Sequence, residues 1–314
     1  MNWGIMGLGH IAHDFATQMN KTRPIYGVAG RTAEEAEQFG KEFQVLHKYS
    51  SYEEMVSDPD IDIIYVATVN SQHLKDIKMS LEAGKHVMCE KAIWGDYEEI
   101  KAMYDLAHSK GLILAEAMTI YHMPLFGKIR DLISDGKLGK IKMIQVDLGS
   151  LKDDNPNNRF FSKELGGGAM LDIGTYVLSF VRHFTSGKLN DPVYVMRKYP
   201  TGVDEMWSIS FDTESGVIAN TNMTFRAKLP KRAVITGDKA YVEVYNYVRA
   251  ETAKIVYPDF SSENISAGET ERALSYEIED FEATVNNPAL GLDYAQQTLD
   301  VVGVMDKLLK AENI

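Results

Sequence analysis

The sequence has 314 residues, of which 45% are hydrophobic and 25% charged, a balance that is typical of a folded globular protein. This length favours two domains over one, because a domain usually holds about 100–200 residues. The net charge of −12 argues against nucleic acid as a partner, since a nucleic-acid-binding surface normally presents clustered cationic side chains.

The cysteine content and the lengths of the apolar runs indicate in which cellular compartment the protein is expected. Cys89 is the single cysteine and cannot form an internal disulfide, and the sequence opens on an apolar strand without a signal segment. We therefore expect a reduced, cytoplasmic protein. No apolar run approaches the roughly 18–20 residues that cross a bilayer, so we expect no membrane partner.

The first part of the chain, residues 1–119, alternates short apolar runs with longer segments of helical period. This pattern predicts β-α-β units, and therefore an α/β domain with a parallel sheet. Thr32 and Ser51 each begin a capping box at a helix start. Buried strands are expected at Asn2–Met6, Ile25–Gly30, Ile63–Ala67, His86–Cys89 and Leu112–Ala115.

A glycine-rich turn follows the first predicted strand and has the Gly-x-Gly-x-x-Ala form of a dinucleotide-binding fingerprint. Gly7 permits the tight turn, Gly9 lets the backbone approach a pyrophosphate, and Ala12 keeps the helix close to the sheet. The helix start supplies amides and positive potential for the phosphates. The candidate cofactor contacts in this turn are Gly7, Leu8, Gly9, His10 and Ile11, although a solvent-facing His10 is an equally good interpretation.

The end of the second predicted strand discriminates between the two nicotinamide dinucleotides. An NAD site usually has an acidic side chain there against the ribose 2′-hydroxyl, whereas this strand ends at Gly30-Arg31-Thr32. Arg31 can hold a 2′-phosphate with its planar fork, so NADP is the predicted cofactor, with contacts from Arg31 and Thr32. NAD stays possible because Glu34 could serve a ribose, and Arg31 could instead be a solvated arginine.

The second part of the chain, residues 120–314, shows alternation in place of helical period. Trp207, Ile209 and Phe211 share one face of a predicted strand, and several such runs in series predict an α+β domain with a mostly antiparallel sheet. Further strands are expected at Lys142–Gly149, Val193–Lys198, Gly216–Phe225, Ala233–Thr236 and Tyr241–Tyr245, and helices at Gly168–Phe184, Glu271–Val285 and Leu292–Leu309.

Four motifs occur in order along the chain: Gly7–Ala12, Ala67–His73, Gly84–Lys91 and Gly166–Gly174. Together they resemble the glucose-fructose oxidoreductase, inositol dehydrogenase and rhizopine-catabolism (Gfo/Idh/MocA) family over nearly the whole chain. Within it the sequence is most similar to the dimeric dihydrodiol dehydrogenase branch, because Tyr176 stands where many members have histidine.

This resemblance implies a Rossmann domain, a second domain with an open sheet, and a nicotinamide between them. It also implies a homodimer or homotetramer, since members commonly pair their open sheets. The residues that it places at the cofactor are Thr68, Asn70, His73, Glu90 and Lys91, of which Lys91 is the catalytic lysine.

Two further residues are weaker candidates, and one position departs from the family. Glu116 resembles the family glutamate near the nicotinamide, with helix capping as the alternative. Arg159, in the loop before Gly166, could reach the cofactor or the substrate, although most loop arginines are solvated. Ala92 departs from the family, whose Lys-Pro bond is often cis, and a non-proline cis bond costs about 2.5–4 kcal/mol. It therefore stays open whether Lys91-Ala92 is cis.

Hydride transfer at an alcohol carbon also moves a proton at oxygen, so the site needs a group that accepts and returns it. Asp172 and Tyr176 are four residues apart and share one face of the predicted helix. Tyr176 is the predicted proton donor and acceptor. Lys91 would stabilise developing charge on the oxygen, or act as the base itself, while Asp172 positions hydroxyls and balances the lysine. No metal is expected.

These observations predict an NADP-dependent oxidoreductase acting on a sugar, a polyol or a cyclic alcohol similar to a trans-dihydrodiol. A sensor that binds dinucleotide without catalysis is one alternative, and an enzyme that uses a bound cofactor for transient oxidation is another. The substrate and the direction of the reaction are not encoded in the motifs, because loops shape the pocket.

Overall fold

The computed structural model describes all residues, 1–314, and the chain forms two compact units. One unit consists of Met1–Ala117 and Leu274–Gln296, and the other of Met118–Ala273 and Gln297–Ile314. The sequence analysis placed 120–314 together, whereas residues 274–296 return to the first unit. That return depends on contacts far apart in the chain, so it has no local sequence signature.

The first unit is built on a six-stranded parallel sheet in the order β3-β2-β1-β4-β5-β6. The five predicted strands are present, and β6 begins later than expected, at Leu114. The additional strand β3 has His47 and Lys48 exposed, so it lacks the apolar run that identifies a buried strand. The strands are β1 (Trp3–Met6), β2 (Gly27–Ala29), β3 (His47–Tyr49), β4 (Ile63–Val66), β5 (His86–Glu90) and β6 (Leu114–Ala117).

Helices connect these strands, and two begin at the caps expected from the sequence. Thr32 accepts a hydrogen bond from the amide of Glu35, and Ser51 accepts one from the amide of Glu54. The helices of this unit are α1 (His10–Met19), α2 (Ala33–Phe43), α3 (Tyr52–Ser57), α4 (His73–Glu82), α5 (Tyr97–Ser109) and α9 (Ala273–Asn286).

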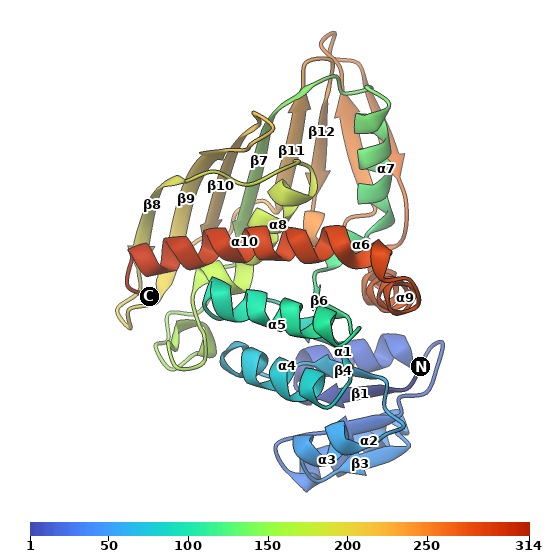
Figure 1. The fold of residues 1–314 in the computed structure, drawn as a ribbon. Coiled ribbons are helices and arrows are strands. Elements are labelled where there is room, and N and C mark those ends of the chain that lie inside the picture. Colours follow the sequence, from blue (N-terminus) through green and yellow to red (C-terminus); the bar gives the residue numbers. More distant parts are fainter. The chain divides into compact units, whose positions relative to one another are not determined.

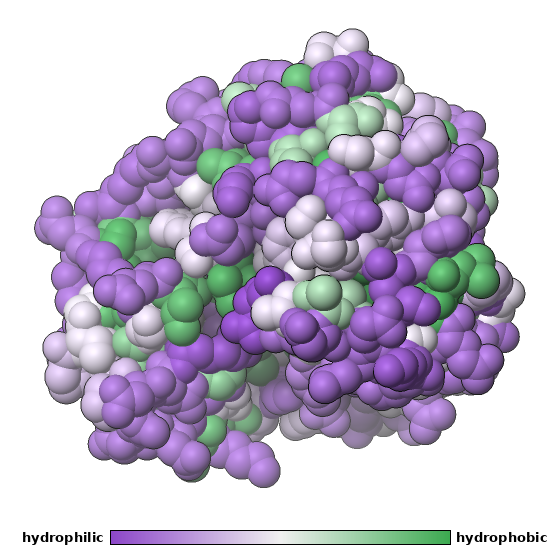
Figure 2. Space-filling model, turned by 90° about the horizontal axis from the view of Figure 1, so that it is seen from below, coloured by the Kyte–Doolittle hydropathy of each residue, from purple (hydrophilic) through white to green (hydrophobic).

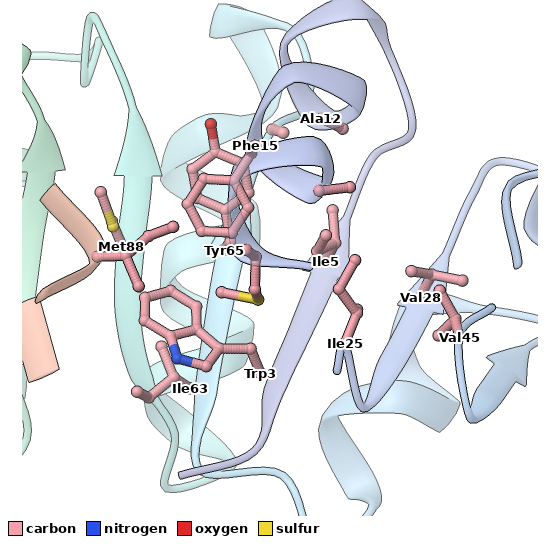
Figure 3. Close-up of a cluster of buried hydrophobic side chains, with 14 of the residues drawn as sticks. Trp3, Ile5, Ala12, Phe15, Ile25, Val28, Val45, Ile63, Tyr65 and Met88 are labelled. Carbon is pink, nitrogen blue, oxygen red and sulfur yellow. The ribbon is translucent and has the colours of Figure 1, made fainter. Parts of the chain in front are cut away.

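The core of the first unit includes side chains of the sheet, of α1 and of α9. Figure 3 shows those of the sheet and α1. The ring of Phe15 stacks on that of Tyr65, with centroids 3.7 Å apart and planes inclined by 10°. Trp3 packs on Phe281 of α9, and its indole nitrogen donates to Glu282 at 2.8 Å. Burying such a side chain contributes about 1.5–3 kcal/mol, which explains why α9 stays with this unit.

The second unit contains an eight-stranded sheet in the order β14-β13-β12-β11-β7-β10-β9-β8. Only β7 and β10 run parallel, so the predicted mostly antiparallel sheet is confirmed. The strands are β7 (Ile141–Gly149), β8 (Val193–Lys198), β9 (Asp204–Asp212), β10 (Ile218–Thr224), β11 (Arg232–Gly237), β12 (Tyr241–Tyr245), β13 (Thr252–Val256) and β14 (Ser262–Ser266).

Helices cover one face of this sheet, where Figure 1 shows α8 (Thr175–His183) and α10 (Leu292–Ala311). As predicted, Trp207, Ile209 and Phe211 face inward, while Ser208 is exposed on the other face. Two further helices, α6 (Thr119–His122) and α7 (Pro124–Ser134), open the unit.

Hydrophilic residues predominate on the face of the molecule in Figure 2, and the hydrophobic residues there form small separate groups. This distribution agrees with the high content of acidic residues in the sequence, 45 Asp and Glu against 33 Lys and Arg. None of the helices combines the length and the apolar character that a membrane span needs.

Candidate active site

The glycine-rich turn joins β1 to α1 and has the geometry that a dinucleotide requires. Gly7 has φ +89°, and a Cβ there would lie 2.9 Å from the carbonyl oxygen of Ala67, so only glycine fits. Gly9 caps α1 without a side-chain acceptor, and a Cβ added to it would meet nothing within 4 Å. The amino end of α1 is therefore open to an anion, and the turn fits a pyrophosphate. Ala12 is fully buried against the sheet, as predicted.

The other residues of the turn lie around this open helix end. Leu8 and Ile11 are half-buried, while the side chain of His10 is 94% exposed and 3.9 Å from Asp14. His10 is thus a solvent-facing histidine in this structure. Thr68 lies beside the turn, because its methyl group would be 2.9 Å from a Cβ on Gly7.

The segment after β4 is held together by buried polar contacts. The hydroxyl of Thr68 donates to Asp76 at 2.7 Å, while Asn70 opens a short 3₁₀ turn and is half-buried. His73 is fully buried, with Nδ1 2.9 Å from the carbonyl oxygen of Ala92 and Nε2 3.0 Å from that of Thr68. Burial lowers the pKa of His73. In this structure, then, His73 braces the segment that follows Lys91.

Lys91 follows the last residue of β5 and is half-buried. Its backbone amide donates to Glu90 Oε2 at 3.2 Å, and the hydroxyl of the fully buried Tyr65 donates to Glu90 Oε1. The Lys91-Ala92 peptide bond is cis. Tyr65 and Glu90 thus fix the backbone that carries the lysine.

Glu116 lies inside β6, with only 5% of its surface exposed. Its Oε1 accepts a hydrogen bond from the amide of Ile93 at 3.1 Å. The carboxylate therefore supports the same segment after Lys91 as His73 does. The amide that Oε1 binds follows strand β5 and does not lie at a helix start.

Arg31 forms an ion pair that the sequence analysis did not anticipate. Its guanidinium donates to Glu35 Oε1 at 2.7 Å, and its backbone amide donates to Glu35 Oε2 at 3.0 Å. Thr32 caps α2 beside it. The acidic side chain at the end of β2 is thus Glu35, whereas Glu34 is exposed. The i,i+4 spacing of Arg31 and Glu35 was the available sequence indication.

In the second unit, Asp172 and Tyr176 lie on one continuous helical segment. The predicted helix forms as a π-helical turn, Met170–Gly174, that continues into α8. From residue 168 to residue 185 every residue is buried except Asp172 and Tyr176, which are half-exposed. These two are therefore the side chains of this helix that remain partly accessible.

Asp172 has a cationic neighbour in its own unit, Lys152, which sequence reasoning missed. Lys152 Nζ lies 3.4 Å from Asp172 Oδ2 and 3.6 Å from the centre of the Phe160 ring. Arg159 is exposed and stacks on the same ring at 4.1 Å, so it is placed beside this group. Lys152 lies in a loop after β7, where no spacing or motif distinguishes it from a solvated lysine.

The start of the helix is anchored by a buried carboxylate, Asp204, at the beginning of β9. Asp204 Oδ2 accepts from the amide of Met170 and from the indole of Trp207, both at 2.6 Å. A Cβ on Gly168 would lie 2.2 Å from Asp204 Oδ1, so glycine is required there. Burial raises the pKa of Asp204 to about 6, against the opposing effect of these hydrogen bonds. Asp204 thereby fixes the segment that carries Asp172.

Comparison with known proteins gives consistent matches in both units. Residues 1–118 match the family described as "Oxidoreductase family, NAD-binding Rossmann fold", and residues 126–243 match the "GFO/IDH/MocA C-terminal domain". Trans-1,2-dihydrobenzene-1,2-diol dehydrogenase of Xenopus laevis is 33% identical over 81% of this chain and 78% of its own. The Danio rerio protein of that name is 31% identical over 82% and 78%.

Solved structures share the fold. An aldose-aldose oxidoreductase from Caulobacter crescentus, complexed with glycerol, superposes with a TM-score of 0.90 at 20% identity, over 100% of this chain and 97% of that one. A 3-ketoreductase from Actinomadura kijaniata, in complex with NADP and TDP-benzene, superposes with a TM-score of 0.87 at 20% identity, over 98% and 96%. At this level of identity the likeness concerns the fold alone.

Proposed function

Because the chain belongs to the Gfo/Idh/MocA family of dinucleotide-dependent oxidoreductases, we propose that it is an NADP-dependent dehydrogenase of a sugar, a polyol or a cyclic alcohol similar to a trans-dihydrodiol. The observation that carries the proposal is the otherwise buried helix on which only Asp172 and Tyr176 are accessible. The names of the sequence relatives and of the structural neighbours support a hydroxylated carbon as the reacting group.

A nicotinamide dinucleotide, when bound at the glycine-rich turn, would supply or accept the hydride. The phenol of Tyr176 gives a proton to the substrate oxygen when a carbonyl is reduced, and takes it back when the alcohol is oxidised. Asp172 accepts hydrogen bonds from neighbouring substrate hydroxyls. Lys152 beside it orients the carboxylate. A substrate with more than one hydroxyl is therefore favoured.

Lys91 supplies positive charge to the substrate oxygen as negative charge develops on it. The lysine ammonium has to stay in one place for this, and its backbone is held on the Glu90 side by Tyr65 and on the Ala92 side by His73. We therefore assign Lys91 the role of charge stabiliser and Tyr176 that of proton carrier.

A substitution of Arg31 tests whether NADP is the preferred cofactor. Replacing Arg31 with alanine removes the planar fork for the 2′-phosphate, so we expect NADPH to bind about tenfold or more weakly while NADH affinity falls much less. Fluorescence titration of the purified protein with NADPH and with NADH measures both dissociation constants without a substrate. Equal affinities of the variant and the wild type for NADPH would contradict the assignment of Arg31.

We also propose that the chain forms a homodimer or a homotetramer through the face of the eight-stranded sheet that no helix covers. That face exposes Val193, Val195 and Ile218, and it also carries Arg197 and Asp147, which can pair across a two-fold axis. Light scattering should give a mass at least twice 35.2 kDa for the wild type. Val195→Glu should reduce this mass to that of one chain, and a wild-type protein that is monomeric at micromolar concentration would refute the proposal.

A further inference from the structure

A carboxylate occupies the end of β2, at the place where the ribose of a dinucleotide meets this sheet in a Rossmann domain. Gly30 leaves the space for it, because a Cβ on Gly30 would lie 3.0 Å from Glu35 Oε2. The same position would be 3.2 Å from Leu8 Cδ1. Glu35 therefore lies next to the glycine-rich turn.

Glu35 also holds the group on which NADP binding depends. Its two oxygens bind the guanidinium and the backbone amide of Arg31, at 2.7 and 3.0 Å. The side chain of Arg31 is otherwise 83% exposed, so Glu35 is its ion-pair partner at this edge. These contacts lower the pKa of Glu35, with the guanidinium hydrogen bond as the largest cause, and the carboxylate is charged at neutral pH.

NADP and NAD differ at the ribose 2′ position, and so in the contacts that they would make with Arg31 and Glu35. A 2′-phosphate carries about −1.5 to −2 charges at neutral pH, so it would share the Arg31 guanidinium with Glu35 and lie beside that carboxylate. A 2′-hydroxyl can instead donate a hydrogen bond to Glu35 and leave the ion pair intact. The half-buried Tyr52 interacts electrostatically with both Arg31 and Glu35.

We propose that Glu35 is the specificity-determining residue at this end of the cofactor, and that it makes the protein accept NAD as well as NADP. The carboxylate competes with the 2′-phosphate for Arg31 and serves as the acceptor for the ribose of NAD. This inference rests on the proposed function, in which Arg31 contacts the 2′-phosphate.

The test is the substitution Glu35→Gln, which keeps an oxygen acceptor for the amide of Arg31 and removes the charge. We expect NADPH to bind about tenfold more tightly, because a negative charge next to the guanidinium that holds the phosphate is removed, and NADH to bind equally or less tightly. The ratio of the two dissociation constants, measured by fluorescence titration, should therefore move toward NADPH by about tenfold.

Glu37→Gln is the matched control, since it removes the same charge from an exposed position of the same helix, and the ratio should not move. A ratio unchanged in Glu35→Gln, in a protein whose NADPH binding is weakened by Arg31→Ala, would overturn the role of Glu35 and leave the proposed function standing. If Arg31→Ala has no effect on NADPH binding, the cofactor assignment fails, and the role of Glu35 fails with it.

Discussion

Replacing Lys91 with alanine should lower kcat by about 10²–10³-fold while dinucleotide binding is largely retained, because removing one preorganised donor to a developing oxyanion has an effect of this size. The loss should appear in kcat and in kcat/KM alike, which identifies an interaction made in the transition state. Steady-state absorbance of reduced nicotinamide gives the rates, and fluorescence titration gives the affinity.

Lys78→Ala is the control for this prediction. Lys78 is a half-exposed lysine in the same unit whose ion pair with Glu82 lies within α4, so its loss should leave the rates unchanged. Lys91→Arg should not restore the rate, since a guanidinium has a different shape and reach from an ammonium. A Lys91→Ala variant with near-normal kcat would remove the lysine from the mechanism.

Replacing Tyr176 with phenylalanine should lower kcat by about 10²–10⁴-fold, the usual contribution of a positioned acid-base group. The ring remains in the helix, so the melting temperature should stay close to that of the wild type and dinucleotide affinity should be kept. Measured kcat over a range of pH should also lose the limb that reports the ionisation of the proton carrier.

Tyr257→Phe provides the comparison, because it removes the same hydroxyl from another tyrosine of this unit, where it donates to Glu263 at 2.5 Å. Its loss should leave kcat unchanged. If Tyr176→Phe retains its rate while Lys91→Ala does not, the lysine itself is the base, which is the alternative that the sequence left open.

Much of the fold could be predicted from the sequence because local patterns encode it. The glycine fingerprint next to a buried strand identifies the first unit, and alternation identifies β9 of the second. β3, β13 and β14 could not be predicted, since they are short or polar and pair only because neighbouring strands are present. The return of α9 to the first unit likewise depends on burial of Trp3 and Phe281 against each other.

The candidate site, like the fold, could be predicted from the sequence only in part. Asp172 and Tyr176 could be paired from their spacing alone, because a helix brings residues four apart to one face. The supporting residues could not be identified: Tyr65, Lys152 and Asp204 act across segments that are distant in the chain. Their side chains are ordinary in the sequence, and only the fold gives them their partners.

The central claim is that the chain catalyses dinucleotide-dependent oxidation of a hydroxylated carbon. The most direct measurement is the appearance of reduced nicotinamide when the wild-type protein and NADP are mixed with a panel of aldoses, polyols and trans-dihydrodiols. We predict turnover with at least one of them, and its loss in both Lys91→Ala and Tyr176→Phe. Tight dinucleotide binding without turnover on any member, in either direction, would contradict the claim and favour a sensor.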